Sequence, residues 1–104
     1  MGRVIAFVSI FPIGVGTSLS KWVKIAVKEL KQHPDLRVQI TPMGTILEAD
    51  EIRTILDALK IAHTAVEKTG VQRISTTLKI DFRTDKDRQM EDKVRALESD
   101  DYVS

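Results

Sequence analysis

The first apolar run of the chain constrains the fold more than any other segment, because both of its alternating faces are apolar. One face of the run from 4 to 11 carries Val4, Ala6, Val8 and Ile10, and the other carries Ile5, Phe7 and Phe11. A strand of this kind is covered on both sides in a folded protein. Pro12 and Gly14 interrupt the run, which favours a strand and a loop over a signal peptide. The chain therefore requires a layer on each side of this strand.

Two amphipathic segments supply helices for one of these layers. Apolar residues recur at helical spacing from Leu19 to Leu30 and again from Ile52 to Val66. The first helix is expected to end near His33, and Gly70 stands where the C-terminal cap of the second helix is expected.

Alternating segments predict three further strands, and the chain ends in a third helix. The strands are expected at 36–41, 45–48 and 71–83, with a turn at Pro42-Met43-Gly44 between the first two. The segment 84–87 is expected to open the last helix, which carries Met90, Val94 and Leu97.

This order of elements is typical of one α+β fold. A β-α-β-β-α-β chain with short connections predicts a ferredoxin-like antiparallel sheet with both helices on one face, here with an additional C-terminal helix. The 104 residues fit one domain, 1–104. The open face of the sheet is expected to carry Ile5, Phe7, Ser9 and Phe11 beside Ser75, Thr77, Lys79 and Asp81.

The apolar part of this open face predicts self-association. Soluble monomers rarely expose several bulky apolar side chains together. Ile5, Phe7 and Phe11 would form such a patch if nothing covered the sheet. We therefore expect a homodimer or homotetramer that is assembled through the sheet face.

Charge and cysteine content argue against several classes of function. The chain has 16 basic and 15 acidic residues, so it lacks the basic excess of nucleic-acid binders and of proteins that bind anionic membranes. It has no cysteine, which excludes disulfides, a cysteine nucleophile and thiolate metal sites and agrees with a cytoplasmic location. No segment approaches the roughly 20 apolar residues of a membrane span.

The loop from 12 to 20 is the first candidate binding segment. It combines glycines with Thr17, Ser18 and Ser20 at an expected helix N-terminus, where hydroxyls and backbone N–H groups can hold an anion or a polar ligand. The spacing of a Walker phosphate-binding loop is absent. The same three hydroxyls also suit simple N-caps, so both roles stay open.

Three segments together resemble a known family. They are Pro12-Ile13-Gly14 with Thr17-Ser18-Leu19-Ser20, then Gly44-Thr45-Ile46-Leu47-Glu48, and then the segment from Thr76 to Lys86. In order and spacing they resemble the small thiamine-binding-protein-like family, which is related to the YkoF thiamine and hydroxymethylpyrimidine binders. The resemblance implies a ferredoxin-like fold, dimers and tetramers formed through the sheets, and a ligand pocket bordered by the loop that contains Thr17, Ser18 and Ser20.

The third strand adds Gly44, Thr45 and Glu48 to the candidates. Gly44 is expected to serve a turn with positive φ. Glu48 is either a solvated strand-end carboxylate or, in a thiamine site, a hydrogen-bond partner of the aminopyrimidine or a counter-charge to the thiazolium.

Thr77, Lys79 and Asp81 complete the candidates on the last strand. Lys79 and Asp81, with Arg83 continuing their row, form either a set of interface ion pairs or the polar floor of a ligand site. Lys79 would repel a cationic ligand, so a thiamine site there needs Asp81 or Glu48 to offset it, whereas a phosphorylated ligand would not.

The remaining chemistry-bearing residues are assigned to structure. His63 lies on the apolar stripe of the second helix, His33 adjoins Pro34 in a loop, and Trp22 is assigned to the core. Two isolated histidines predict no metal site, and no motif indicates a cofactor or a catalytic centre.

A cytoplasmic oligomeric protein that binds thiamine or a related pyrimidine is therefore the leading hypothesis. The alternative is an ACT-like regulatory or structural interaction module without catalysis. An RNA-binding domain would need aromatic residues on its sheet, and the last strand offers Ser75, Thr77 and Lys79 outward with no aromatic among them. A small enzyme acting on a nucleotide or vitamin intermediate is the remaining hypothesis.

Overall fold

The computed structural model describes residues 4–85 and 90–98, and it has the predicted α+β architecture. The elements follow one another as β1 (Val4–Pro12), α1 (Ser20–Gln32), β2 (Arg37–Thr41), β3 (Gly44–Ala49), α2 (Ile52–Glu67), β4 (Ile74–Phe82) and α3 (Met90–Glu98). This is the ferredoxin-like order with the additional helix at its end. The expected opening of that helix at 84–87 is wrong for Thr84 and Asp85, which precede it, and 86–87 lie outside the described residues.

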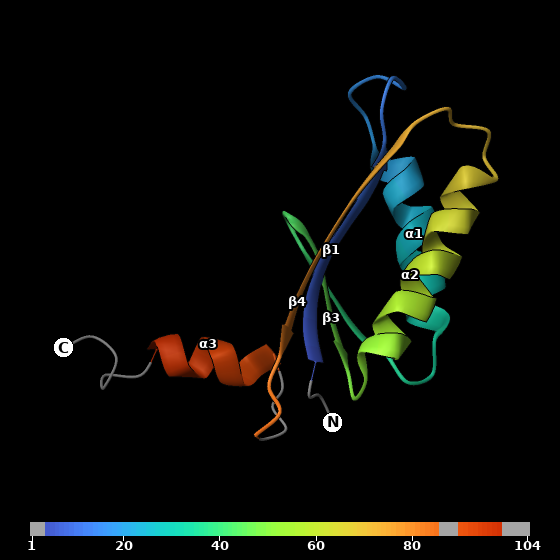
Figure 1. Cartoon of the computed structure of the whole chain (residues 1–104). Coiled ribbons are helices and arrows are strands. Elements are labelled where there is room, and N and C mark those ends of the chain that lie inside the picture. Colours follow the sequence, from blue (N-terminus) through green and yellow to red (C-terminus); the bar gives the residue numbers. More distant parts are fainter. Residues whose placement is uncertain (1–3, 86–89, 99–104) are drawn as a thin grey trace.

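The strands form one antiparallel sheet in the order β2-β3-β1-β4. α1 and α2 pack side by side on one face of this sheet, whereas α3 lies on the opposite side (Figure 1). The sheet is therefore the middle layer, and α1 and α2 leave its second face to be covered by α3 or by another molecule.

The alternation along β1 decides which side chains enter the core. Val4, Ala6, Val8 and Ile10 are all at most 5% exposed and pack with residues of both helices and of β3, among them Leu30, Leu47, Ile55 and Val66. On the other face, the register sets Ile5, Phe7, Ser9 and Phe11 opposite Asp81, Lys79, Thr77 and Ser75 of β4. The predicted division of β1 into a core face and an open face is thus confirmed.

The exposure of the open face differs from the sequence-based expectation at one residue. Ile5 is only 7% exposed within the chain itself, while Phe7 and Phe11 are half-buried. The apolar strip is therefore partly covered within the chain, and its exposed part is smaller than expected.

The helix ends also differ from the expected caps. α1 has Leu19 at its N-cap and no side-chain capping bond, so the N-cap role expected for Thr17, Ser18 or Ser20 is wrong. Gly70 lies two residues beyond the C-cap of α2, at Lys68, and adopts the positive φ of 89° that glycine tolerates.

Candidate functional site

One cavity of the structure results from an unequal pairing of β1. This strand pairs with β4 along its whole length, from Val4 to Pro12, but with β3 only from Val4 to Val8. Beyond Val8, the β2–β3 hairpin has already turned back at Pro42 and Met43. One edge of β1 therefore faces an open space at Ser9–Phe11, where no described strand is paired with it.

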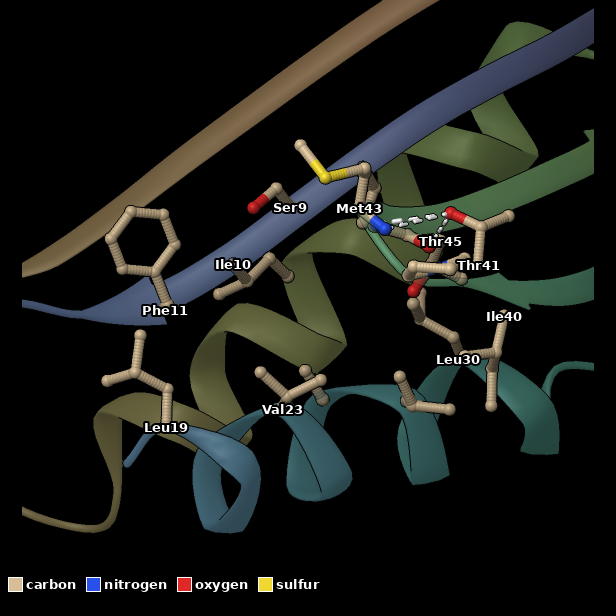
Figure 2. A pocket seen from close by; sticks show the side chains of 15 residues that line it. Ser9, Ile10, Phe11, Leu19, Val23, Leu30, Ile40, Thr41, Met43 and Thr45 are labelled. Atoms are coloured by element: carbon tan, nitrogen blue, oxygen red, sulfur yellow. Dashed lines mark hydrogen bonds between the residues drawn. The ribbon is translucent and has the colours of Figure 1, made fainter. Parts of the chain in front are cut away.

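This space is a cavity of about 230 Å³ that α1 closes from below (Figure 2). Leu19, just before α1, and Val23 of α1 border it on one side, and Ile10 and Phe11 of β1 and Met43 of the hairpin border it on the other. Its lining is mainly apolar, and Ser9, Thr41 and Thr45 are polar residues among those that border it. A mainly apolar hollow with a few polar groups is the usual form of a small-molecule site.

The hairpin tip that borders the cavity is held by one threonine. Thr41 Oγ1 accepts hydrogen bonds from the backbone N–H groups of Met43 at 3.3 Å and Gly44 at 3.2 Å, and it donates to the Gly44 carbonyl at 2.7 Å. These contacts leave Met43 84% exposed at the turn. The wall of the cavity on this side is thus a fixed turn.

Gly44 is needed for close packing and not for its φ angle. The expectation of a positive φ is wrong, because only Gly14, Gly16 and Gly70 have one among the described residues. A Cβ at Gly44 would lie 2.6 Å from Cζ of Phe7 and closer still to Cε2 of the same ring. The ring of Phe7 therefore occupies the place of the missing side chain on the open face.

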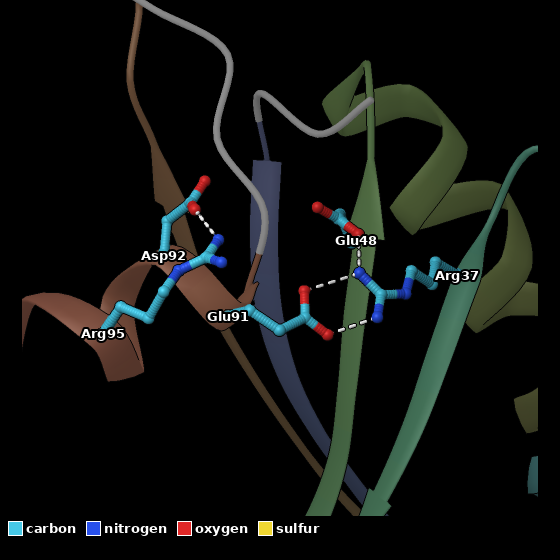
Figure 3. A network of polar contacts seen from close by, with 5 residues as sticks. All are labelled: Arg37, Glu48, Glu91, Asp92 and Arg95. Atoms are coloured by element: carbon cyan, nitrogen blue, oxygen red, sulfur yellow. Dashed lines mark hydrogen bonds and ion pairs between the residues drawn. The ribbon is translucent and has the colours of Figure 1, made fainter.

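A polar cluster lies at the end of the sheet opposite the cavity (Figure 3). Glu48 is 4% exposed, and its Oε2 accepts a hydrogen bond of 3.1 Å from Arg37 Nη1. Arg37 also donates two bonds to Glu91 of α3, one of them 2.7 Å long. Hydrogen bonding from Arg37 lowers the pKa of Glu91, and hydrogen bonds to Glu91 and then Glu48 raise the pKa of Arg37.

The same end of the sheet carries a second link to α3. Lys93 forms an ion pair with Asp81 on β4. Asp81 and Glu48 are both register partners of Ile5, so the two links to α3 flank this residue. Asp81 directly, and Glu48 through Arg37, therefore hold α3 against the sheet. The contacts of both carboxylates are thus structural.

The nine predicted site residues separate into three groups. Thr17 and Ser18 are exposed in the loop before α1, and Ser20 begins that helix. Gly44 and Thr45 line the cavity. Glu48, Thr77, Lys79 and Asp81 lie on the open face and do not line the cavity, and Thr77 and Lys79 are exposed there.

The residues that shape the cavity were missed in the sequence for an understandable reason. Leu19, Val23 and Val27 fit the apolar stripe of a helix, so their pattern indicates core packing alone. The pairing of Arg37 with Glu48, in contrast, could have been predicted from the sequence. A turn at Pro42-Met43 pairs Thr41 with Gly44, and counting back from there sets Arg37 opposite Glu48.

Two of the residues that the sequence assigned to structure, Trp22 and His33, make contacts within the chain. Trp22 packs against the core cluster, with Lys21 Nζ 5.5 Å from its ring centre. His33 Nδ1 accepts a bond from the backbone N–H of Asp35. Over the described ranges, no group of three or more acidic, histidine or cysteine residues could hold a metal. No helix in these ranges is long and apolar enough to cross a membrane.

Sequence comparison finds relatives over nearly the whole chain. Residues 6–98 match the thiamine-binding protein family. A UPF0045 protein of Methanothermobacter thermautotrophicus is 43% identical over 95 residues, which cover 90% of this chain and 95% of that protein. A UPF0045 protein of Methanocaldococcus jannaschii is 45% identical over 97 residues, which cover 93% and 94%.

Structure comparison finds the same fold in solved proteins. The crystal structure of a hypothetical protein from Methanocaldococcus jannaschii matches with a TM-score of 0.84 at 44% identity, over 94% of this chain and 98% of that one. A Thermotoga maritima protein, proposed to act in thiamine biosynthesis or salvage, matches with a TM-score of 0.77 at 19% identity, over 89% and 96%. At that identity the second match concerns the fold alone.

Proposed function

The chain belongs to the thiamine-binding protein family, and on this premise we propose that it binds thiamine or a related aminopyrimidine in the cavity beside β1. The observation that carries the proposal is a ring-sized hollow bordered by the free edge of a strand. Family membership by itself supports small-molecule binding, and the cavity gives that binding a location.

The size of the cavity supports a single aromatic ring as the bound group. Apolar cavities of about 150 Å³ already accept benzene. A volume of about 230 Å³ leaves room for a six-membered heterocycle with small substituents. The apolar side chains of Leu19, Val23 and Ile10 would contact the faces and edges of such a ring.

The free edge of β1 supports the pyrimidine in particular. A residue in a strand presents its N–H and C=O toward the same side, so an edge without a partner strand offers a donor beside an acceptor. An aminopyrimidine has the complementary pair, a ring nitrogen that accepts and an exocyclic amino group that donates. Ser9–Phe11 would supply this pair, with the hydroxyls of Ser9 and Thr45 as further partners.

Lys79 does not oppose the binding of thiamine at this location. Lys79, which would repel the thiazolium, lies on the open face opposite Phe7 and does not line the cavity. Asp81 and Glu48 are then not required as counter-charges, which agrees with their pairing to Lys93 and Arg37.

Calorimetry with a cavity-blocking variant tests the proposal. Val23 is 39% exposed at the mouth of the cavity, so V23W should fill the opening without burying a new polar group. We expect wild type to bind thiamine and 4-amino-5-hydroxymethyl-2-methylpyrimidine, and V23W to lose at least about tenfold in affinity, or 1.4 kcal/mol.

A matched variant separates blocking from unfolding. Ile61 is a 52% exposed apolar residue of α2 outside the cavity, so I61W makes a similar change elsewhere. I61W should bind as wild type does. Failure of wild type to bind either compound, or equal losses in the two variants, would contradict the proposal.

We extend the proposal to the behaviour of the whole protein. It acts by binding and not by catalysis, it associates with further copies through the open sheet face, and it works in the cytoplasm. The support for self-association is that α1 and α2 leave this face free, while α3 is tied to the row at one end.

A further inference from the structure

A second hollow adjoins the cavity on the outer side of α1. It is a groove of about 540 Å³ between α1 and the edge of β2. Val23, Val27 and Ile40 line both the groove and the cavity. A molecule that is too long for the cavity would therefore extend over these three side chains into the groove.

Three lysines border this groove on successive turns of α1. Lys24, Lys28 and Lys31 are separated by four and three residues, which places them on one face of the helix. All three are exposed, and no carboxylate of the described chain is within ion-pair distance of them. Like charges at this spacing weaken a helix, so the row has a cost when nothing neutralises it.

The helix dipole accounts for only one of these lysines. Lys31 lies in the last turn of α1, where a positive charge is favourable. Lys24 and Lys28 lie further from that end, and they face an apolar floor formed by Val23, Val27 and Ile40. The combination of an apolar floor with unneutralised cations suits an anionic group attached to an apolar body.

We propose that the groove binds the phosphate of a phosphorylated ligand whose ring occupies the cavity, so that phosphate esters bind more tightly than the free alcohol. This inference rests on the proposed function, because the ring site is the same cavity. A cavity of about 230 Å³ holds one ring, so the alcohol-bearing second ring of thiamine lies outside it. A phosphate on that alcohol carries about −1.5 to −2 charges at pH 7, which the lysines neutralise.

The test compares thiamine with its monophosphate by calorimetry, in wild type and in two matched double variants. At about 0.1 M salt, where charges interact over about 10 Å, we expect the ester to bind about tenfold more tightly to wild type. K24Q/K28Q should remove this preference, because it takes away both the attraction for the phosphate and the repulsion of the cationic thiazolium. K60Q/K68Q removes the same charge at a surface outside the groove and should keep the preference.

The outcomes distinguish this inference from the proposed function. Equal affinity of wild type for thiamine and its monophosphate would overturn the proposed phosphate site in the groove. Equal losses of ester binding in the two double variants would overturn it as well. If neither compound binds, the cavity proposal fails, and inorganic diphosphate then tests the groove alone by NMR. Shifts of α1 amides that K24Q/K28Q abolishes would support the anion site, and their absence would overturn it.

Discussion

The contact between Gly44 and Phe7 shows how one residue position can be set by packing alone. The aromatic ring of β1 lies where a side chain of β3 would project, and the carbonyl of Val8 is only 3.1 Å from the same point. A methyl group at Gly44 must therefore displace the ring, and the Val8 carbonyl must adjust slightly. We expect G44A to lower the free energy of unfolding by about 1–3 kcal/mol, measured by urea denaturation.

A double-mutant cycle identifies the contact that causes this loss. Leucine at position 7 is smaller than phenylalanine and has no ring atoms over Gly44, so F7L should reduce the cost of G44A. A cost of G44A that is unchanged in the F7L background would exclude the ring as its cause. The sequence predicted that this position requires glycine, but not the reason, because the ring and the glycine are 37 residues apart in the chain.

At the scale of elements, α3 has a buried residue, Met90, at its start, and it is also tied to the sheet by charges that a change in pH can remove. The Arg37 hydrogen bonds keep the pKa of Glu91 below its ordinary value of 4.5. A carboxyl with a lower pKa in the docked state binds fewer protons there than when released. Docking of α3 is therefore fully favoured above the ordinary pKa and weakens as the pH falls through the lowered value.

Hydrogen exchange of the α3 amides tests this attachment. Acidification below 4.5 should release α3 before α1, α2 and the sheet lose protection, and E91Q should cause the same release at neutral pH. Arg95 pairs with Asp92 inside α3 and does not bridge two elements, so R95Q should leave the protection of α3 unchanged. Equal exchange in E91Q and wild type would show that another contact holds the helix.

The helices and strands were predictable from the sequence, whereas the position of α3 was not. Periodicity reports which face of an element is apolar, and this was sufficient for β1, α1 and α2. The contact that fixes α3 joins Arg37 to Glu91, which are 54 residues apart, and no local pattern encodes it. The cavity was missed for the same kind of reason, because it depends on where β3 ends relative to β1.

At the scale of the whole molecule, the open face divides into a part that contacts α3 and a part that does not. The row Arg37, Glu48, Ile5 and Asp81 is bound to α3 by its charged side chains. The next row contains Gln39, Ile46, Phe7 and Lys79, and Ser9 and Thr77 follow. A second copy that covers the sheet must therefore contact these later rows, since α3 is tied to the first.

Thr77 is the position at which this assembly can be tested without disturbing the core. Its side chain is exposed on β4 opposite Ser9, so T77R should fold normally and place a bulky charge in the interface. Sedimentation should give at least twice the 11.7 kDa of the chain for wild type at micromolar concentration and a shift toward the monomer for T77R. A stable interface buries about 800 Å² on each partner, so one central arginine in it is not easily accommodated.

An arginine substitution on the helical side, matched to T77R, tests whether the copies associate through the sheet. Thr64 is exposed on α2, on the face of the molecule opposite to the open sheet face, and T64R adds the same side chain there. If T64R remains associated while T77R dissociates, the copies meet through the sheet. A monomeric wild type, or dissociation by T64R alone, would contradict the proposed assembly. In that case the single chain would tolerate the partial exposure of Phe7 and Phe11, and α3 would cover only the end of the open face that contains Ile5.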